Sequence, residues 1–207
     1  IAFDILNLRG VTGSKLKWLY LFLAAPIKSV FYTHKEEFYV VEIDGERPHE
    51  TEFLASWLRP EVTLWISLGL SHAVQFEQQV KDGLFENLDK AITHEFAMLP
   101  EYTQKLVIID GDVELMVRAL ESIKQKGLTD ANVVKCSKQA LTAYQVMPDQ
   151  TNFKIKLSED TSPREYIFNR PLSKDLTIQL VMLENLAKYL KIKPCSDLSD
   201  FRLAPGR

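Results

Sequence analysis

The sequence has few cysteines and no long apolar run, and each shortage excludes a class of protein. Only Cys136 and Cys195 occur among its 207 residues. They lack the spacing of a metal motif, so we expect reduced thiols in a cytoplasmic protein. A membrane-spanning helix needs about 20 apolar residues, and the apolar run at residues 18–25 is far shorter. The sequence shows no signal peptide, repeat or low-complexity tract. We therefore expect no membrane partner.

The sequence also lacks a large excess of positive or negative charge. Lysine and arginine total 25 and aspartate and glutamate 28, a net charge of −3, which argues against a dedicated nucleic-acid or membrane-surface binder. With 46% hydrophobic and 26% charged residues, the chain can bury a proper core. Its length suits one large domain or one and a half small ones, and we expect a single domain over residues 1–207. Because it starts within a strand-like run and stops just after Pro205 and Gly206, we expect a domain of a longer polypeptide with flanking N- and C-terminal domains.

The sequence does have a glycine turn near its start. Residues 10–18 read Gly-Val-Thr-Gly-Ser-Lys-Leu-Lys-Trp; they follow an apolar run and lead into the helix-compatible residues 15–25. A strand, a glycine turn and a helix can cradle a phosphate with backbone N–H groups, and Lys17 could reach a β- or γ-phosphate. However, Leu16 and Trp18 stand where such a loop needs glycine and a magnesium-binding hydroxyl. Ordinary packing of the turn therefore stays open beside phosphate binding.

Two polar residues follow apolar, strand-like runs farther along the chain. Residues 38–43 read Phe-Tyr-Val-Val-Glu-Ile, which is typical of a strand covered on both faces and places Glu42 near its carboxyl end. Residues 62–67 form the next such run, and His72 follows it after a glycine. Open α/β sheets place their ligands at the carboxyl ends of strands, so Glu42 and His72 are candidate ligands of a divalent metal. A solvent-exposed carboxylate and a surface or helix-capping histidine are the alternatives.

The rest of the sequence predicts an α/β fold: a mostly parallel sheet flanked by helices, with a small antiparallel meander near the C-terminal third. Asp110, Gly111 and Asp112 follow one buried strand, where they could bind a ribose or adenine edge, although a helix N-cap at Asp112 is favoured. The expected helices are residues 50–58, two within 75–100, 113–126 and 172–192, and the expected strands are residues 29–33, 105–109, 132–136, 141–147, 152–157 and 165–168. The last helix would face the core with Leu176, Leu180, Leu183, Leu186, Ala187 and Leu190.

In several of these places the sequence resembles the central, ATP-binding domain of the Mur ligase family, most of all the enzymes that add D-alanyl-D-alanine to the UDP-MurNAc-peptide. Residues 10–18 are similar to the family's Gly-x-Thr-Gly-Ser-x-Gly-Lys-Thr loop. Residues 40–42 and 48–50 are similar to its Val-Val-Glu strand and Pro-Gly-Glu helix start. Residues 59–76 resemble the strand that leads to Asn-Ile-Gly-x-Ala-His-Leu-x-x-Phe, and residues 201–207 the passage into the C-terminal domain at Pro-Gly-Arg.

This resemblance implies a P-loop-like domain of an ATP-dependent ligase of peptidoglycan precursor synthesis. Such an enzyme phosphorylates a carboxylate with ATP and lets an amino group attack the acyl phosphate, so its ligands would be a nucleotide and a UDP-MurNAc-peptide-like substrate. Lys17 would be catalytic, and Glu42 and His72 would bind Mg²⁺. The nucleotide would be held by Lys17 together with Gly10, Thr12, Gly13, Ser14, Asp110 and Arg207.

The sequence also departs from the family at several functional positions. Besides Leu16 and Trp18, residues 91–99 contain no lysine where the family carries a carbamylated one. Two hypotheses follow: a divergent ATP-dependent amide ligase, and a non-catalytic Mur-ligase-like domain retained for packing, for binding a partner or as a scaffold. The other departures are the turn Asp110-Gly111-Asp112 in place of Asn-x-Asp, and Ser173, Asp175 and Gln179 in place of the Gly-x-His and Asn near adenine.

Overall fold

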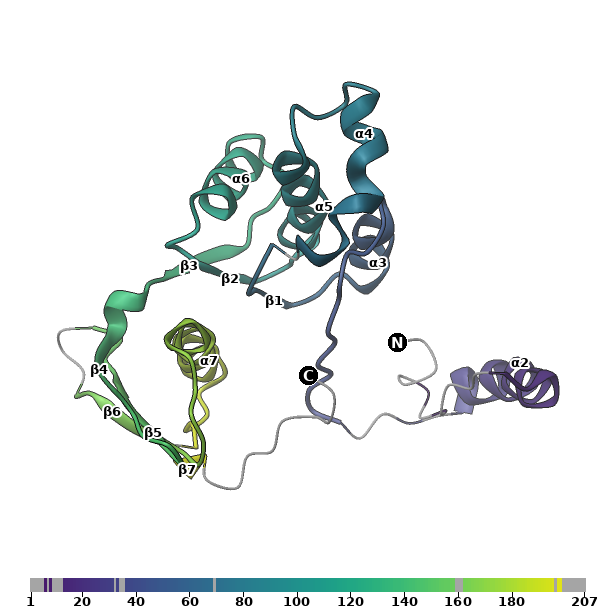
Figure 1. The fold of residues 1–207 in the computed structure, drawn as a ribbon. Helices are drawn as coiled ribbons and strands as arrows, with labels where there is room; N and C mark the ends of the chain where they lie inside the picture. Colours follow the sequence, from purple (N-terminus) through teal and green to yellow (C-terminus); the bar gives the residue numbers. More distant parts are fainter. Residues whose placement is uncertain are drawn as a thin grey trace. The chain divides into compact units, whose positions relative to one another are not determined.

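The chain divides into two compact units, Ile1–Ile43 and Asp44–Arg207. The computed structural model (Figure 1) describes Leu6, Leu8, residues 13–31, Thr33, and residues 36–68, 70–158, 162–195 and 197–198, with the backbone alone at residues 70–72. The expectation of one domain over residues 1–207 stays a prediction. Among the described residues, no helix is both long and apolar enough to cross a membrane.

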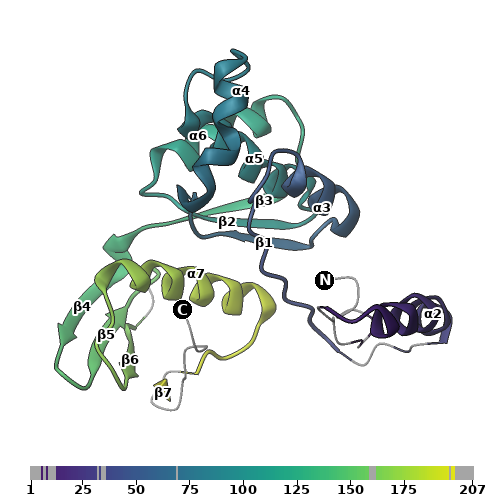
Figure 2. The ribbon, with the colours of Figure 1, turned by 45° about the vertical axis from the view of Figure 1, so that its right-hand side comes forward.

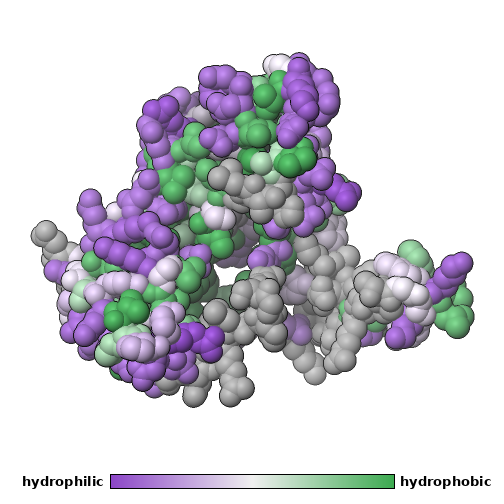
Figure 3. Space-filling view, viewed as in Figure 1, coloured by the Kyte–Doolittle hydropathy of each residue, from purple (hydrophilic) through white to green (hydrophobic). Residues whose placement is uncertain are grey.

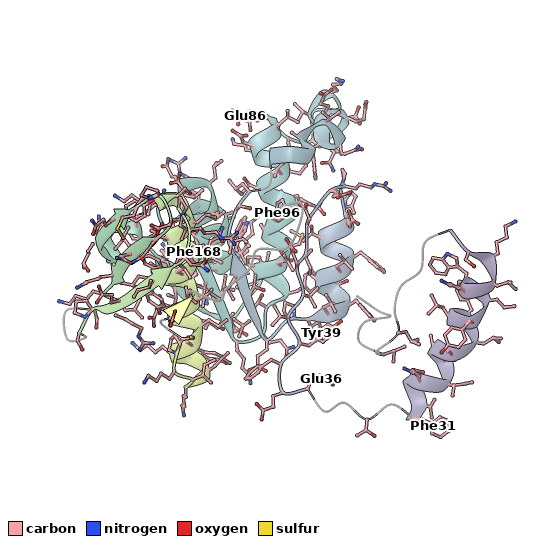
Figure 4. The ribbon with its side chains drawn as sticks, turned by 60° about the horizontal axis from the view of Figure 1, so that its bottom comes forward. Phe31, Glu36, Tyr39, Glu86, Phe96 and Phe168 are labelled. Atoms are coloured by element: carbon pink, nitrogen blue, oxygen red, sulfur yellow. The ribbon has the colours of Figure 1, made fainter. Side chains whose placement is uncertain are left out.

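The first unit contains helix α2, Lys15–Phe31. It follows Gly13, whose φ of +83° is a conformation that glycine adopts without strain. The predicted helix is confirmed and runs six residues beyond residue 25, so the strand expected at residues 29–33 is wrong over residues 29–31. Figure 4 shows Phe31 at the end of this helix. Apolar surface positions are green in Figure 3. The large hydrophobic residues of α2 that are more than half exposed are Leu16, Leu19, Tyr20, Phe22, Leu23, Ile27, Val30 and Phe31.

The strand expected at residues 38–43 is also wrong. Residues 38–46 have no regular secondary structure, and Figure 4 shows Tyr39 on this stretch. The Val40 side chain is 92% exposed. An apolar, β-branched run becomes a strand only when another strand pairs with its N–H and C=O groups. No described strand pairs with these residues.

The second unit contains the parallel sheet that was predicted. Its strands are β1 (Val62–Trp65), β2 (Leu106–Asp110) and β3 (Asn132–Cys136), in the order β1-β2-β3. Leu106 of the central strand pairs with Val62 on one side and with Asn132 on the other. The predicted helices are confirmed as α3 (Glu50–Leu58), α4 (Glu77–Lys81), α5 (Leu88–Tyr102) and α6 (Glu114–Gln125), and a 3-10 helix, η1 (Leu70–Phe76), precedes α4.

The predicted meander forms a second sheet. Strands β4 (Leu141–Val146), β5 (Thr151–Ile155) and β6 (Arg164–Phe168) are antiparallel, and β7 (Asp197–Leu198) pairs with β6 in parallel. Helix α7, Thr177–Leu190, is confirmed. Short 3-10 helices, η2 (Lys138–Ala140) and η3 (Lys174–Leu176), precede β4 and α7. Part of the predicted core face of α7 is wrong: Leu176 and Leu183 are 40% and 48% exposed, whereas Ile178, Val181 and Met182 are buried. Ala187 is buried as predicted.

Strand β2 separates two hydrophobic cores because successive side chains of a strand point to opposite faces of the sheet. Val107 and Ile109 belong to the core formed with α5 and α6. Leu106 and Ile108 belong to the core formed with α7 and the second sheet. Figures 1 and 2 show α7 between the two sheets. The other helices of this unit lie on the opposite face of the parallel sheet. All five residues of β2 are buried, as expected for a parallel strand covered on both faces.

Candidate functional site

A tight polar turn lies at the carboxyl edge of the parallel sheet, the edge formed by the C-terminal ends of β1, β2 and β3. Asp110 ends β2 and is 7% exposed; its Oδ1 accepts the Asp112 N–H at 2.9 Å. The Gly111 N–H donates to the Cys136 carbonyl at the end of β3, over 2.6 Å. A Cβ at position 111 would lie 2.9 Å from that carbonyl oxygen. Glycine therefore allows this turn to lie directly against the neighbouring strand.

Lys138 lies at the centre of the charges on this edge. Its N–H donates to Asp112 Oδ2 at 2.8 Å, and its Nζ lies 2.7 Å from Asp175 Oδ1. The hydrogen bond and charge of Asp175, and after them the charges of Asp110 and Asp112, raise the pKa of Lys138. Lys138 in turn lowers the pKa of Asp175. These carboxylates are therefore paired within the protein, and ribose binding at this edge stays a prediction.

The favoured role of Asp112 as a helix cap is wrong. Helix α6 begins at Glu114, and Val113 occupies the N-cap position without a side-chain hydrogen bond. The Asp112 carboxylate instead accepts the Lys138 N–H, 26 residues farther along the chain. Local sequence favoured the cap, but the return of β3 to this edge supplied a competing donor.

Cys136 lies beside this turn as a buried thiol. Its Sγ accepts a hydrogen bond from Asn185 Nδ2 of α7 at 3.4 Å. Burial, and secondarily the charge of Asp110, raise the pKa of Cys136 to about 11, although the Asn185 hydrogen bond lowers it slightly. The thiolate is the reactive form of cysteine, so the Cys136 thiol has low reactivity in the folded protein.

A thiol reagent should therefore modify Cys195 and spare Cys136. Cys195 is exposed and Cys136 is buried. In a Cys195→Ser variant at pH 8, we expect Cys136 to react at least about 100-fold more slowly than Cys195 does in a Cys136→Ser variant, because burial shields the Cys136 thiol and raises its pKa to about 11. Mass spectrometry during a maleimide time course measures both rates. Equal rates in the folded proteins would contradict the burial of Cys136.

A buried carboxylate on α5 holds the start of α3, a contact that the sequence analysis missed. Glu95 is 5% exposed; its Oε1 accepts the Thr51 N–H at 2.7 Å and its Oε2 the His49 N–H at 2.9 Å. The first N–H groups of a helix lack partners within the helix, and His49 at the N-cap position of α3 provides no side-chain cap. The signal in the sequence was a lone glutamate before the apolar residues 96–99 of a buried helix.

The predicted phosphate-binding residues are described only in part. Gly13 and Ser14 precede α2, and Lys17 is exposed in its first turn. The Leu16 and Trp18 side chains on either side of Lys17 are 79% and 39% exposed. Gly10, Thr12 and Arg207 lie outside the described residues. Phosphate binding by these residues stays a prediction.

The predicted magnesium ligands fall in different units. Glu42 is exposed and belongs to the first unit, and His72 lies in η1 of the second, where only its backbone is described. Within the part of the chain that the structure describes, no group of three or more histidine, cysteine, aspartate or glutamate side chains is arranged to hold a metal ion. The pairing of Glu42 with His72 stays a prediction.

Comparison with solved structures finds the same fold in two Mur ligases. The structure of MurF ligase from Thermotoga maritima in complex with ADP matches with a TM-score of 0.64 and 12% identity, covering 100% of this chain and 45% of that one. MurF from Acinetobacter baumannii matches with a TM-score of 0.60 and 12% identity, covering 81% and 34%. The chain thus spans less than half the length of both. No family model matches the sequence, and no curated protein matches it.

Proposed function

We propose that this chain is a nucleotide-binding domain of the Mur ligase type and that the nucleoside end of ATP binds at the carboxyl edge of the sheet β1-β2-β3. The observation that carries the proposal is the Asp110 turn, which places carboxylates at the edge where α/β sheets receive their ligands. The agreement of fold over the whole chain with a ligase solved with ADP supports it.

In this proposal each predicted site residue has a role. Lys17 is the catalytic cation on the phosphates, and the backbone of Gly10, Thr12, Gly13 and Ser14 cradles them. Asp110 accepts hydrogen bonds from the ribose, and Arg207 contacts a phosphate. Glu42 and His72 hold Mg²⁺, which neutralises phosphate charge when bound.

The reaction proposed for the active protein is ATP-dependent amide formation through an acyl phosphate. Its substrate would be a UDP-MurNAc-peptide-like carboxylate. Its partners would include flanking domains of the same chain, and it would act in the cytoplasm. Positioning and charge neutralisation supply most of the catalysis in phosphoryl transfer. Residues of this chain would accordingly act by binding and orienting the reactants.

A second candidate function is a non-catalytic scaffold with the same fold. Leu16 and Trp18 favour it, because they flank Lys17 in the first turn of α2 where a phosphate-binding loop needs glycine and a hydroxyl. The α5 helix favours it as well. Its Glu95 carboxylate is bonded to the start of α3, and residues 91–99 include no lysine.

A calorimetric titration with ATP and Mg²⁺ separates the two functions. If the chain binds nucleotide, Lys17→Ala should weaken binding by about tenfold or more, because the charge-assisted hydrogen bonds to phosphate are lost. Lys15→Ala is the matched control, since Lys15 is also exposed in the first turn of α2, and its affinity should stay within about twofold of the wild type. The absence of saturable binding at millimolar nucleotide would overturn the nucleotide proposal in favour of the scaffold.

A further inference from the structure

We propose that the outer side of α3 is a docking surface for an arginine-bearing segment of another protein. Three residues form this surface, Glu50, Phe53 and Trp57, and we call them the α3 stripe. They combine a carboxylate with two aromatic rings. The whole stripe lies in the second unit, and the proposed nucleotide site uses none of its residues, so the inference stands apart from the proposed function.

The α3 stripe follows from the spacing of residues in a helix. Positions 50, 53 and 57 are three and four residues apart, so they lie on one side of α3. Thr51 and Ala55, on the other side, are 0% exposed. Figures 1 and 2 show α3 beside α5, on the far side of α5 from α6. The core therefore covers one side of α3 and leaves the stripe facing outwards.

The two aromatic residues of the stripe are exposed although they belong to a well-packed helix. Phe53 is 69% exposed and Trp57 is 56% exposed. In the described part of the second unit, no other phenylalanine, tyrosine or tryptophan is exposed. A helix that is apolar on both sides is normally covered on both, and tryptophan is a frequent anchor of protein interfaces. The pair therefore indicates a surface that another protein covers.

Glu50 adds an uncompensated negative charge beside this pair. Its Oε2 is buried and accepts no hydrogen bond. Among the described residues neither Arg47, three positions earlier, nor any other cation pairs with its carboxylate. By contrast, Glu52 Oε2 lies 3.3 Å from His49 Nδ1. A partly buried charge without a counter-ion costs free energy, so a cation brought by a partner would relieve a cost that the folded chain carries alone.

The chemistry of the stripe favours arginine over other cations. A planar guanidinium can stack on an aromatic ring while its N–H groups bond a carboxylate. Helical side chains lean towards the N-terminus, so Phe53 and Trp57 lean towards Glu50. The helix dipole places only about +0.5 charge at this end, and the carboxylates of Glu50, Glu52 and Glu95 outweigh it. The ammonium of lysine is more strongly hydrated and offers no plane to stack.

Peptide binding to the whole chain tests the proposal. The probes are short glycine–serine peptides that carry arginine, lysine or neutral citrulline at the same positions, and NMR follows the indole Nε1–H of Trp57. We expect saturable shifts with the arginine peptide. The citrulline peptide should bind at least about tenfold more weakly, because the charge-assisted hydrogen bonds and the cation–π attraction are lost. The lysine peptide should bind at least about threefold more weakly.

Variants of the helix locate the binding. Glu50→Gln should weaken binding of the arginine peptide by about tenfold or more, since a hydrogen bond between charged groups is lost. Phe53→Ala should weaken it by about two- to fivefold. Glu52→Gln is the matched control, because this carboxylate lies in the same turn but off the stripe, and its effect should stay within about twofold. The Tm of each variant should stay within about 2 °C of the wild type.

Several results would overturn the proposal. Absence of a saturable shift, or equal binding of the citrulline peptide, would show that no cation is recognised, and equal binding of the lysine peptide would remove the choice of arginine. Equal losses in Glu50→Gln and Glu52→Gln would indicate unspecific charge attraction. A wild-type dimer in sedimentation that Trp57→Ala converts to a monomer would make a second copy the occupant. A larger fall in Tm for Trp57→Ala would show that the chain itself covers the stripe.

Discussion

Replacement of Ile108 by alanine should lower the free energy of unfolding by about 2–5 kcal/mol, the range measured for large-to-small changes in cores. Ile108 is 0% exposed on the central strand β2 and belongs to the core that includes α7 and the second sheet. Alanine would leave a cavity that neither sheet can fill, because the parallel ladder fixes β2 on both sides. For a chain of this size each kcal/mol lowers Tm by about 2–4 °C. Chemical denaturation followed by circular dichroism measures the loss.

The matched control is the same substitution at the surface. Ile167 lies on β6 and is 43% exposed. Ile167→Ala should cost less than about 1 kcal/mol, mostly through lower β propensity. If Ile108→Ala were as mild as Ile167→Ala, β2 would not be buried between two cores as described.

Removal of the Glu184 carboxylate should cost about 2–4 kcal/mol, because the polar groups left behind are partly buried. Glu184 of α7 is 6% exposed. It accepts a hydrogen bond from the Tyr166 hydroxyl, and Arg164 Nε lies 3.3 Å from its Oε1. Glu184→Ala would leave Tyr166 and Arg164 without this acceptor. Denaturation of Glu184→Ala, compared with Tyr166→Phe at about 1–2 kcal/mol, measures the difference; equal losses would contradict a shared acceptor.

The same cluster predicts a loss of stability at high pH. Burial, and then the hydrogen bond and charge of Glu184, raise the pKa of Tyr166 above its usual value near 10. The folded protein therefore holds the phenol proton more tightly than the unfolded chain does. This contribution is complete below about pH 10 and is lost as the pH rises further. A plot of Tm against pH from 8 to 11 should fall less steeply for Tyr166→Phe than for the wild type. Parallel curves would contradict the raised pKa.

Patterns within short segments identified the helices and buried strands of the second unit. Residues 106–109 are apolar throughout, and β2 is buried on both faces. Asn87 marked the break before α5, and its side chain accepts the Lys90 N–H at 2.9 Å. Closely spaced β-type runs after residue 140 predicted the antiparallel meander, because no room was left for crossover helices. Each of these signals depends on neighbours along the chain.

The predictions were wrong where contacts with residues far along the chain determine the structure. Residues 38–43 have the composition of a strand, but described strands pair elsewhere. Leu176 and Leu183 are as apolar as the residues that face the core of α7, yet the docking of this helix buried Met182 instead. In the candidate site, the sequence placed Asp110 at the end of a strand. It could not reveal the hydrogen bond that the Lys138 N–H donates to Asp112, or the one that the His49 N–H before α3 donates to Glu95.

By itself, then, the sequence determined which segments of the second unit are helical or buried, since hydrogen bonding within a helix and hydrophobic periodicity are local properties. Only the tertiary structure determined which acceptor pairs with each backbone N–H group that lacks a local partner, and which face of each helix is buried. Those choices bring together residues 26 to 46 positions apart, and no local pattern records the competition among such distant partners.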